Sequence, residues 1–100
     1  MRPVTISKTG TGATDWVAVD YRQLPFAIGF GVVVSGTITY TVEHTFDNVF
    51  DSAVTPTAFP HSTLATQTTS KDGNYAFPIR AIRLNNTAGT GTTTLTVLQG

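Results

Sequence analysis

The chain has 100 residues, six Lys+Arg against six Asp+Glu, and no cysteine. This length suits one domain with a single hydrophobic core, so we expect residues 1–100 to form one domain. The absence of cysteine excludes a disulfide scaffold, a zinc ribbon and thiol catalysis, and leaves the redox compartment open. The net charge of zero gives no support to a nucleic-acid-binding face, so we expect no nucleic acid as a partner.

Charged residues make up 12% of the chain, against about 25% in ordinary soluble domains, and Thr fills 20 of the positions. A surface rich in hydroxyls and poor in charge favours a chain that packs against neighbours. The start of the chain lacks the apolar region of a secretory signal, and the longest apolar stretch, residues 24–34, is too short to span a bilayer. We therefore expect no membrane partner, and a chain that begins and ends with its gene.

Strands are predicted along the whole chain. Thr, Val, Ile, Tyr and Phe dominate, and no window has the i, i+3, i+4, i+7 spacing of an amphipathic helix. Two short strands are predicted at 4–6 and 16–19, and a longer one at 26–34. Gly29 and Gly31 share one face of the longer strand, which predicts a large aromatic side chain or another backbone against that face.

Period-two alternation is clearest in residues 37–46, where apolar side chains take one face and mostly Thr side chains the other. The apolar face is expected to hold Ile38, Tyr40, Val42 and Phe46. Ser35-Gly36 lies between this strand and the one at 26–34, and a two-residue link containing Gly predicts a tight hairpin.

Residues 47–70 predict a long excursion that contains a turn, a short helical piece and a weak strand at 64–67. Phe50 and Phe59 are expected to be the apolar anchors of this excursion. Residues 71–74 have the composition of a turn.

A second hairpin is predicted between strands at 76–85 and 92–99, because residues 86–91 are rich in turn formers. Its ladder would place Ile82 and Leu84 opposite Leu95 and Val97. Together the predicted elements indicate an all-β chain that folds as a single antiparallel β-sandwich, jelly-roll-like or immunoglobulin-like.

Groups able to perform catalysis are sparse. His44 is expected to be half-buried against a backbone carbonyl, and His61, which follows a proline in a loop, is expected to be exposed. No serine has the context of a nucleophile elbow. We therefore expect no enzymatic activity, no catalytic residues and no cofactor.

Two binding alternatives stay open. Oxygen ligands close together in a loop suit calcium, but their spacing here departs from the EF-hand loop, and turn formation is the stronger expectation; they are Glu43, Asp47, Asn48 and Asp51. An aromatic platform for a sugar could include Trp16, although most of the aromatic residues fall on faces expected to form the core.

Four residues are candidates for a protein interface: Arg80, Arg83, Phe50 and Phe59. The two arginines lie three apart on a predicted strand and so face opposite sides, unless Pro78 introduces a bulge. Arginine is enriched at interface cores, and a solvated sheet edge is the alternative for both.

Three segments resemble small virion proteins of tailed bacteriophages: VSGTITYTVEHTFD at 34–47, YAFPIRAIRLN at 75–85 and GTTTLTVLQ at 91–99. Such proteins have about this size, are Thr-rich and Cys-free, and close with an Arg-Leu-Asn hairpin followed by a Thr-alternating strand. Asn86 departs from the pattern, which has an apolar residue after Arg-Leu-Asn. The resemblance covers residues 32–99 and implies a structural component built into a virion in many copies, inside the host bacterium.

The resemblance applies equally to the head surface and the tail, and our leading expectation is a capsid decoration (cement) protein that binds the major capsid protein as a homo-oligomer, with a trimer favoured. Symmetric assembly would convert a weak contact into a strong attachment. A tail, collar or fibre-attachment component is the alternative within the virion. From another class, a host-glycan-binding β-sandwich module would show Trp16 or a tyrosine exposed on a concave face.

Overall fold

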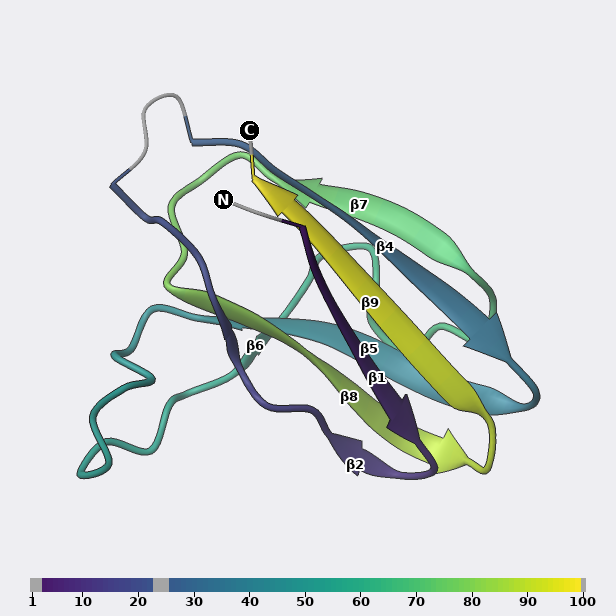
Figure 1. Ribbon diagram of the computed structural model, residues 1–100. Helices are drawn as coiled ribbons and strands as arrows, with labels where there is room; N and C mark the ends of the chain where they lie inside the picture. The colour runs from purple at the N-terminus through teal and green to yellow at the C-terminus, as the bar shows by residue number, and fades with distance from the viewer. Residues whose placement is uncertain (1–2, 23–25, 100) are drawn as a thin grey trace.

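Two antiparallel sheets pack face to face in the computed structural model (Figure 1), which describes residues 3–22 and 26–99. This confirms the all-β sandwich prediction. Within the described residues there is no helix that could cross a membrane. Two parts of the segments considered above as a secretory signal and as a membrane span lie outside the described residues: 1–2 and 24–25.

Each sheet has a simple order. The first sheet runs β1 (Val4–Thr9), β9 (Thr92–Gln99), β4 (Ile28–Ser35) and β7 (Lys71–Tyr75). In the second sheet, β2 (Gly12–Ala13) and β3 (Val17–Ala18) both pair with β8 (Ala81–Gly89), which pairs with β5 (Ile38–Thr45) and then β6 (Phe59–Pro60).

The same three chain segments lie side by side in both sheets. β1 leads to β2 and β3, β4 leads to β5, and β8 leads to β9, so a three-stranded ribbon folds over on itself. Glycines with positive φ stand where the three segments cross: Gly10 at 75°, Gly36 at 84° and Gly89 at 104°. Backbone bonds join the crossings, because Gly10 N donates to Gly91 O (3.0 Å) and Gly91 N donates to Thr37 O (2.8 Å). We call this end of the sandwich the glycine corner.

Both predicted hairpins are wrong for this reason. The links at 35–36 and 90–91 join strands of different sheets, since β4 pairs with β9 and β5 pairs with β8. Leu95 is therefore a ladder partner of Val32, and it meets Leu84 only through the shared core. A short link that contains glycine can form a hairpin within one sheet or a corner between two sheets. The corner is favoured because it lets the apolar faces of both strands pack against each other in the core.

The core lies between the sheets and follows the alternation of the strands. β5 contributes its predicted apolar face, with Tyr40 and Val42 fully buried. The prediction that Phe46 belongs to this apolar face is wrong, because Phe46 lies beyond the end of β5 and is 48% exposed. The core cluster consists of Val17, Val19, Phe26, Ile28, Phe30, Val32, Tyr40, Val42, Leu64, Tyr75, Ile79, Ile82, Leu84, Leu95 and Val97.

The aromatic contact expected over a glycine occurs at a different glycine. Nothing lies within 4 Å of a Cβ placed on Gly29 or Gly31, so neither expectation for those two positions holds. At Gly73 a Cβ would lie 2.9 Å from Phe30 Cζ. The predicted turn at 71–74 is thus part of strand β7, because its glycine lets the Phe30 ring pack against the backbone.

The excursion at 47–70 is anchored by other residues than predicted. Phe50 is 84% exposed and Phe59 45% exposed, whereas Leu64 and His61 are buried. Residues 47–52 contain turns and bends but no helical piece, and of the strand expected at 64–67 only a single bridge from Gln67 to Tyr40 forms.

Asn86 is a buried polar residue of the glycine corner. Its Nδ2 donates to Lys8 O (3.1 Å) and Gly10 O (2.9 Å), and its Oδ1 accepts from Thr93 Oγ1 (2.8 Å). The side chain therefore ties β1, β8 and β9 together, which an apolar residue at this position would not do.

Replacing Gly89 by alanine tests the corner. A Cβ there would lie 2.5 Å from Thr37 O and 2.8 Å from Ile38 Cα, on a backbone with positive φ. We expect Gly89→Ala to lower the free energy of unfolding by about 3 kcal/mol in urea denaturation. Gly29→Ala is the matched control and should change it by less than about 1 kcal/mol; equal losses would show that the corner is not tightly packed.

Asn86→Asp probes the polar bonds of the corner with almost no change of shape. The carboxylate would face two carbonyl oxygens in place of an amide donor, so we expect a loss of about 3 kcal/mol in thermal or urea unfolding. Asn48→Asp makes the same exchange in an exposed loop and keeps the oxygen that accepts from Phe50 N. A small effect at both positions would contradict the bonding described for Asn86.

Candidate functional site

Three phenylalanines form an exposed aromatic surface at the end of the sandwich opposite the glycine corner. Phe46 follows β5, Phe59 lies in β6 and Phe77 stands between β7 and β8; they are 48%, 45% and 48% exposed. Their ring centroids lie 5.4, 5.9 and 5.6 Å from that of His44. Phe46 also contacts Phe59 and Phe77, with centroids 5.7 and 6.4 Å apart, so the surface is continuous.

His44 forms the buried base of this aromatic surface. It is 7% exposed, and its Nδ1 lies 2.9 Å from the Tyr75 hydroxyl, not against the backbone carbonyl that the sequence suggested. Burial, and then the nearby His61, lower the pKa of His44. Burial, and then Glu43, raise the pKa of Tyr75. Both shifts favour the uncharged forms, so a neutral imidazole and a protonated hydroxyl share this buried hydrogen bond.

His61 is buried, which contradicts its predicted exposure in a loop. Its Nε2 donates to Asn74 O (3.0 Å), and its Nδ1 accepts from Thr63 N (3.1 Å) and Leu64 N (3.3 Å). Edge-on contacts with Phe30 and Tyr75 complete its surroundings. Both ring nitrogens are thus used to fold the 61–64 segment onto β7.

The acidic residues hold turns. Asp47 Oδ2 accepts from Thr57 N (2.7 Å) and Asp51 Oδ1 accepts from Ala53 N (2.9 Å). In the described ranges no three His, Cys, Asp or Glu side chains come together as a metal site would require. These bonds fit turn formation, which was the stronger expectation for the acidic residues, rather than the calcium-binding alternative.

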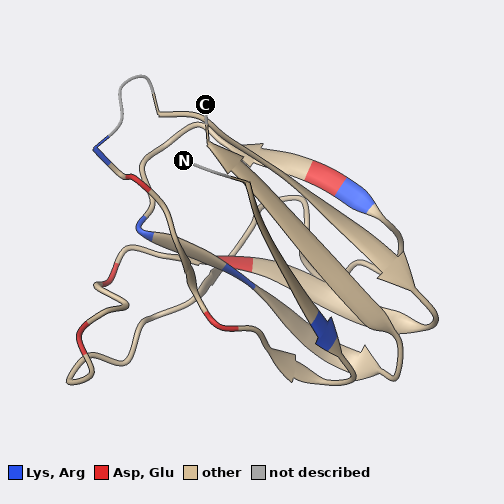
Figure 2. Ribbon diagram, in the orientation of Figure 1, with Lys and Arg blue, Asp and Glu red and all other residues tan. Residues whose placement is uncertain are grey.

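Arg83 lies on the outer face of the second sheet, where its side chain contacts other residues of this chain. Its Nε donates to Glu43 Oε1 (2.8 Å), and its guanidinium lies 4.3 Å from the Trp16 ring centroid. This contact covers one face of the tryptophan that the sugar-binding alternative required. Charged residues are otherwise sparse on the strands, and β4 and β9 carry none (Figure 2).

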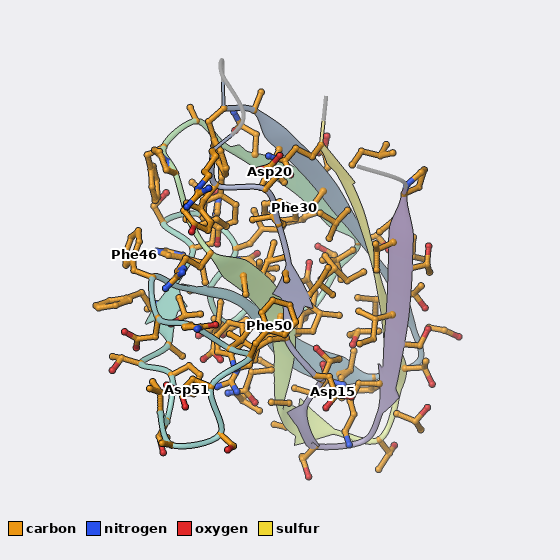
Figure 3. All side chains as sticks on the ribbon, turned by 60° about the vertical axis from the view of Figure 1, so that its left-hand side comes forward. Asp15, Asp20, Phe30, Phe46, Phe50 and Asp51 are labelled. Carbon is orange, nitrogen blue, oxygen red and sulfur yellow. The ribbon has the colours of Figure 1, made fainter. Side chains whose placement is uncertain are left out.

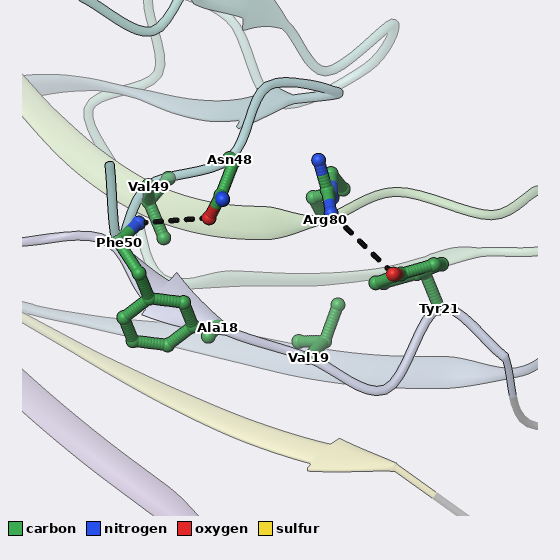
Figure 4. A pocket seen from close by; sticks show the side chains of 7 residues that line it. All are labelled: Ala18, Val19, Tyr21, Asn48, Val49, Phe50 and Arg80. Carbon is green, nitrogen blue, oxygen red and sulfur yellow. Dashed lines mark hydrogen bonds between the residues drawn. The ribbon is translucent and has the colours of Figure 1, made fainter. Parts of the chain in front are cut away.

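Arg80 and Phe50, two of the four candidate interface residues, line one pocket of about 350 Å³ (Figure 4). The Arg80 guanidinium lies 4.8 Å from the Tyr21 ring centroid, and its Nη2 donates to the Tyr21 hydroxyl at 3.4 Å. The pocket is lined by Ala18, Val19, Tyr21, Asn48, Val49, Phe50 and Arg80.

The structure thus divides the four candidates among three places: Arg80 and Phe50 in the pocket, Phe59 in the aromatic surface, and Arg83 in an ion pair. Figure 3 places Phe46 at the margin of the molecule and Phe50 over its middle. The sequence reasoning missed Tyr21, Phe46 and Phe77 as surface residues. The available signal for Phe46 and Phe77 was their position next to turn-forming Asp47 and Pro78.

No protein-family model matches this chain, and no curated protein matches it in sequence. Among solved structures, a chain from the Bacillus endospore appendages, which form a novel family of disulfide-linked pili, is similar in fold. The two align with a TM-score of 0.51 and 17% identity, over 96% of this chain and 82% of that one. At this identity the likeness shows a shared β-rich fold alone.

The buried His44 makes stability depend on pH. The unfolded chain takes up a proton at His44 near pH 6.5, whereas the folded chain resists protonation until a lower pH. Stability contributed by this residue is therefore complete above about pH 6.5 and declines as the pH falls through the lowered folded-state pKa. His44→Asn keeps an acceptor for Tyr75 and removes the titration.

We expect urea midpoints measured between pH 8 and 5 to fall less steeply for His44→Asn than for the original chain. The variant should lose about 1–2 kcal/mol at pH 8, because a buried ring is replaced by a smaller side chain. Parallel profiles for the two proteins would show that His44 does not carry this dependence.

Proposed function

We propose that this chain is a non-enzymatic structural subunit that assembles in many copies through its aromatic surface. The observation that carries the proposal is the continuous group of Phe46, Phe59 and Phe77, each about half exposed. Interface cores are depleted in charge and enriched in aromatic residues, and a few such residues supply most of the binding energy. Contiguous exposed apolar groups rimmed by polar residues mark interaction sites more often than scattered ones do.

The base of this surface supports a binding role. His44 contacts all three rings and is itself fixed by the Tyr75 hydroxyl, so the rings are held in place before any partner arrives. Binding to a prearranged surface loses less side-chain entropy than binding to mobile rings. Among the described residues, no three His, Cys, Asp or Glu side chains gather at this surface as a metal site would require.

Self-assembly would be non-covalent. The pilus of similar fold is disulfide-linked, and the present chain contains no cysteine. An open sheet edge offers a second contact, because β1 pairs with β9 on one side and has no neighbour of the described residues on the other. Association along such an edge also protects it from uncontrolled pairing.

The assembly we propose is a bacteriophage virion, where the chain would decorate the capsid as a homo-oligomer, a trimer by preference, bound to the major capsid protein. The support is the resemblance of 34–47 and 75–85 to small virion proteins, since these two segments carry Phe46 and Phe77. A tail, collar or fibre-attachment position in the virion is the alternative.

Association is measured first, by light scattering at several concentrations. We expect the original chain to form a trimer or larger ring, or to bind purified empty capsids. The double variant Phe46→Ser with Phe77→Ser should keep its melting temperature within a few degrees and lose at least tenfold in association, because it removes apolar contact area. Val33→Ser is the matched control, since Val33 is 63% exposed in β4 of the first sheet.

Protein composition of virions released by cells that carry this gene tests the location. Many copies per particle in the head fraction would support capsid decoration, and enrichment in the tail fraction would favour the alternative. Absence from the particles, together with a clean monomer in solution, would overturn the proposal.

A further inference from the structure

The pocket beside Tyr21 combines an apolar floor with a few polar groups, as small-molecule sites do. Ala18, Val19 and Val49 supply the apolar part, and the rings of Tyr21 and Phe50 stand at its sides (Figure 4). Its volume of about 350 Å³ lies at the lower end of the range for ligand sites and provides room for a single ring.

Arg80 gives the pocket an unneutralised positive charge. A guanidinium has five N–H donors, and the side-chain bond recorded for Arg80 is the 3.4 Å contact with the Tyr21 hydroxyl. Among the described residues no carboxylate lies within ion-pair distance of it. Arg22 adds a second cation 5.7 Å from the Tyr21 ring centroid, and the two arginines, Arg80 foremost, lower the pKa of Tyr21.

The other groups suit a sugar ring. Phe50 is 84% exposed and Tyr21 39% exposed, and the negative face of an aromatic ring attracts the C–H face of a pyranose. Asn48 uses its Oδ1 to accept from Phe50 N, which leaves its amide N–H groups as donors for hydroxyls. Backbone bonds fix Arg80 in place, because Arg80 N donates to Thr45 O (2.9 Å) and Val19 N donates to Arg80 O (3.1 Å).

We infer that this pocket binds one acidic sugar unit, a pyranose that carries a carboxylate, with the carboxylate on Arg80, a C–H face on Phe50 or Tyr21, and hydroxyls on Asn48. Arginine pairs with carboxylates through two parallel hydrogen bonds, which fixes the orientation of the ligand. The inference does not rest on the proposed assembly role. A weak site of this kind becomes an effective attachment to acidic polysaccharide when it is repeated on a particle.

Titration with glucuronate, followed by NMR chemical shifts in low salt, tests the inference. We expect saturation in the millimolar range, with shifts confined to the pocket, and at least tenfold weaker binding of glucose, which lacks the carboxylate. Benzoate, a flat aromatic acid of similar size, should also bind more weakly, because it has no hydroxyls for Asn48.

Arg80→Gln keeps the backbone bonds and should weaken glucuronate binding at least tenfold without lowering the melting temperature by more than a few degrees. Lys71→Gln removes one exposed positive charge from β7, away from the pocket, and should leave binding unchanged. This control separates the pocket from a general effect of charge.

Three results would overturn the inference: no shifts at saturating glucuronate, glucuronate binding that survives Arg80→Gln, or benzoate binding as tight as that of glucuronate. None of them depends on the oligomeric state. Loss of association in the Phe46 and Phe77 variant is measured separately, so failure of the assembly proposal and failure of the sugar site are distinguishable.

Discussion

Gly89 approaches Thr37 so closely that no side chain fits between them, and the rest of the sandwich depends on that contact. A Cβ on Gly91 would likewise lie 2.5 Å from Ser35 O. The three chain segments contact one another where they pass from the first sheet to the second. They therefore keep the same neighbours in both sheets. The buried Asn86 adds side-chain bonds to Lys8 O and Gly10 O, where the chain passes from β1 to β2.

The corner also determines where the surface features lie. β5 and β8 leave the corner side by side, so Phe46, which follows β5, and Arg80, which precedes β8, emerge together at the far end of the sheet. The long excursion that starts at Phe46 returns through β6 and brings Phe59 back beside His44. One end of the sandwich is thus closed by backbone contacts, and the other end presents aromatic side chains and a charged pocket.

Alternation of side chains is local, and for that reason the sequence was sufficient to predict the sandwich, most of its longer strands and much of the core, as at Ile38, Tyr40 and Val42. It did not predict β7, because residues 71–74 have the composition of a turn. Strand partners are not local: Leu95 has the same pattern whether it pairs with Leu84 or with Val32, and burial decides. The candidate site was harder still. Phe46 continues the apolar alternation of its strand and yet lies outside the sandwich, because the sheet ends at Thr45. His61 and Tyr21 acquire their roles from residues far along the chain, Asn74 and Arg80.

An exposed apolar surface has to meet two requirements, and the neutral His44 beneath the three phenylalanines contributes to both. In the proposed binding role, the surface must be firm enough to bind one partner and must not spread into nonspecific contacts. The Tyr75 bond fixes the imidazole, and the imidazole fixes the rings around it, so the apolar area stays confined to that end of the sandwich. Burial and the nearby His61 both disfavour protonation of this imidazole, so it stays uncharged over a wider pH range than a free histidine. The uncharged imidazole of His44 thus contributes to the stability of this end of the sandwich, on which the proposed binding role of the surface would also depend.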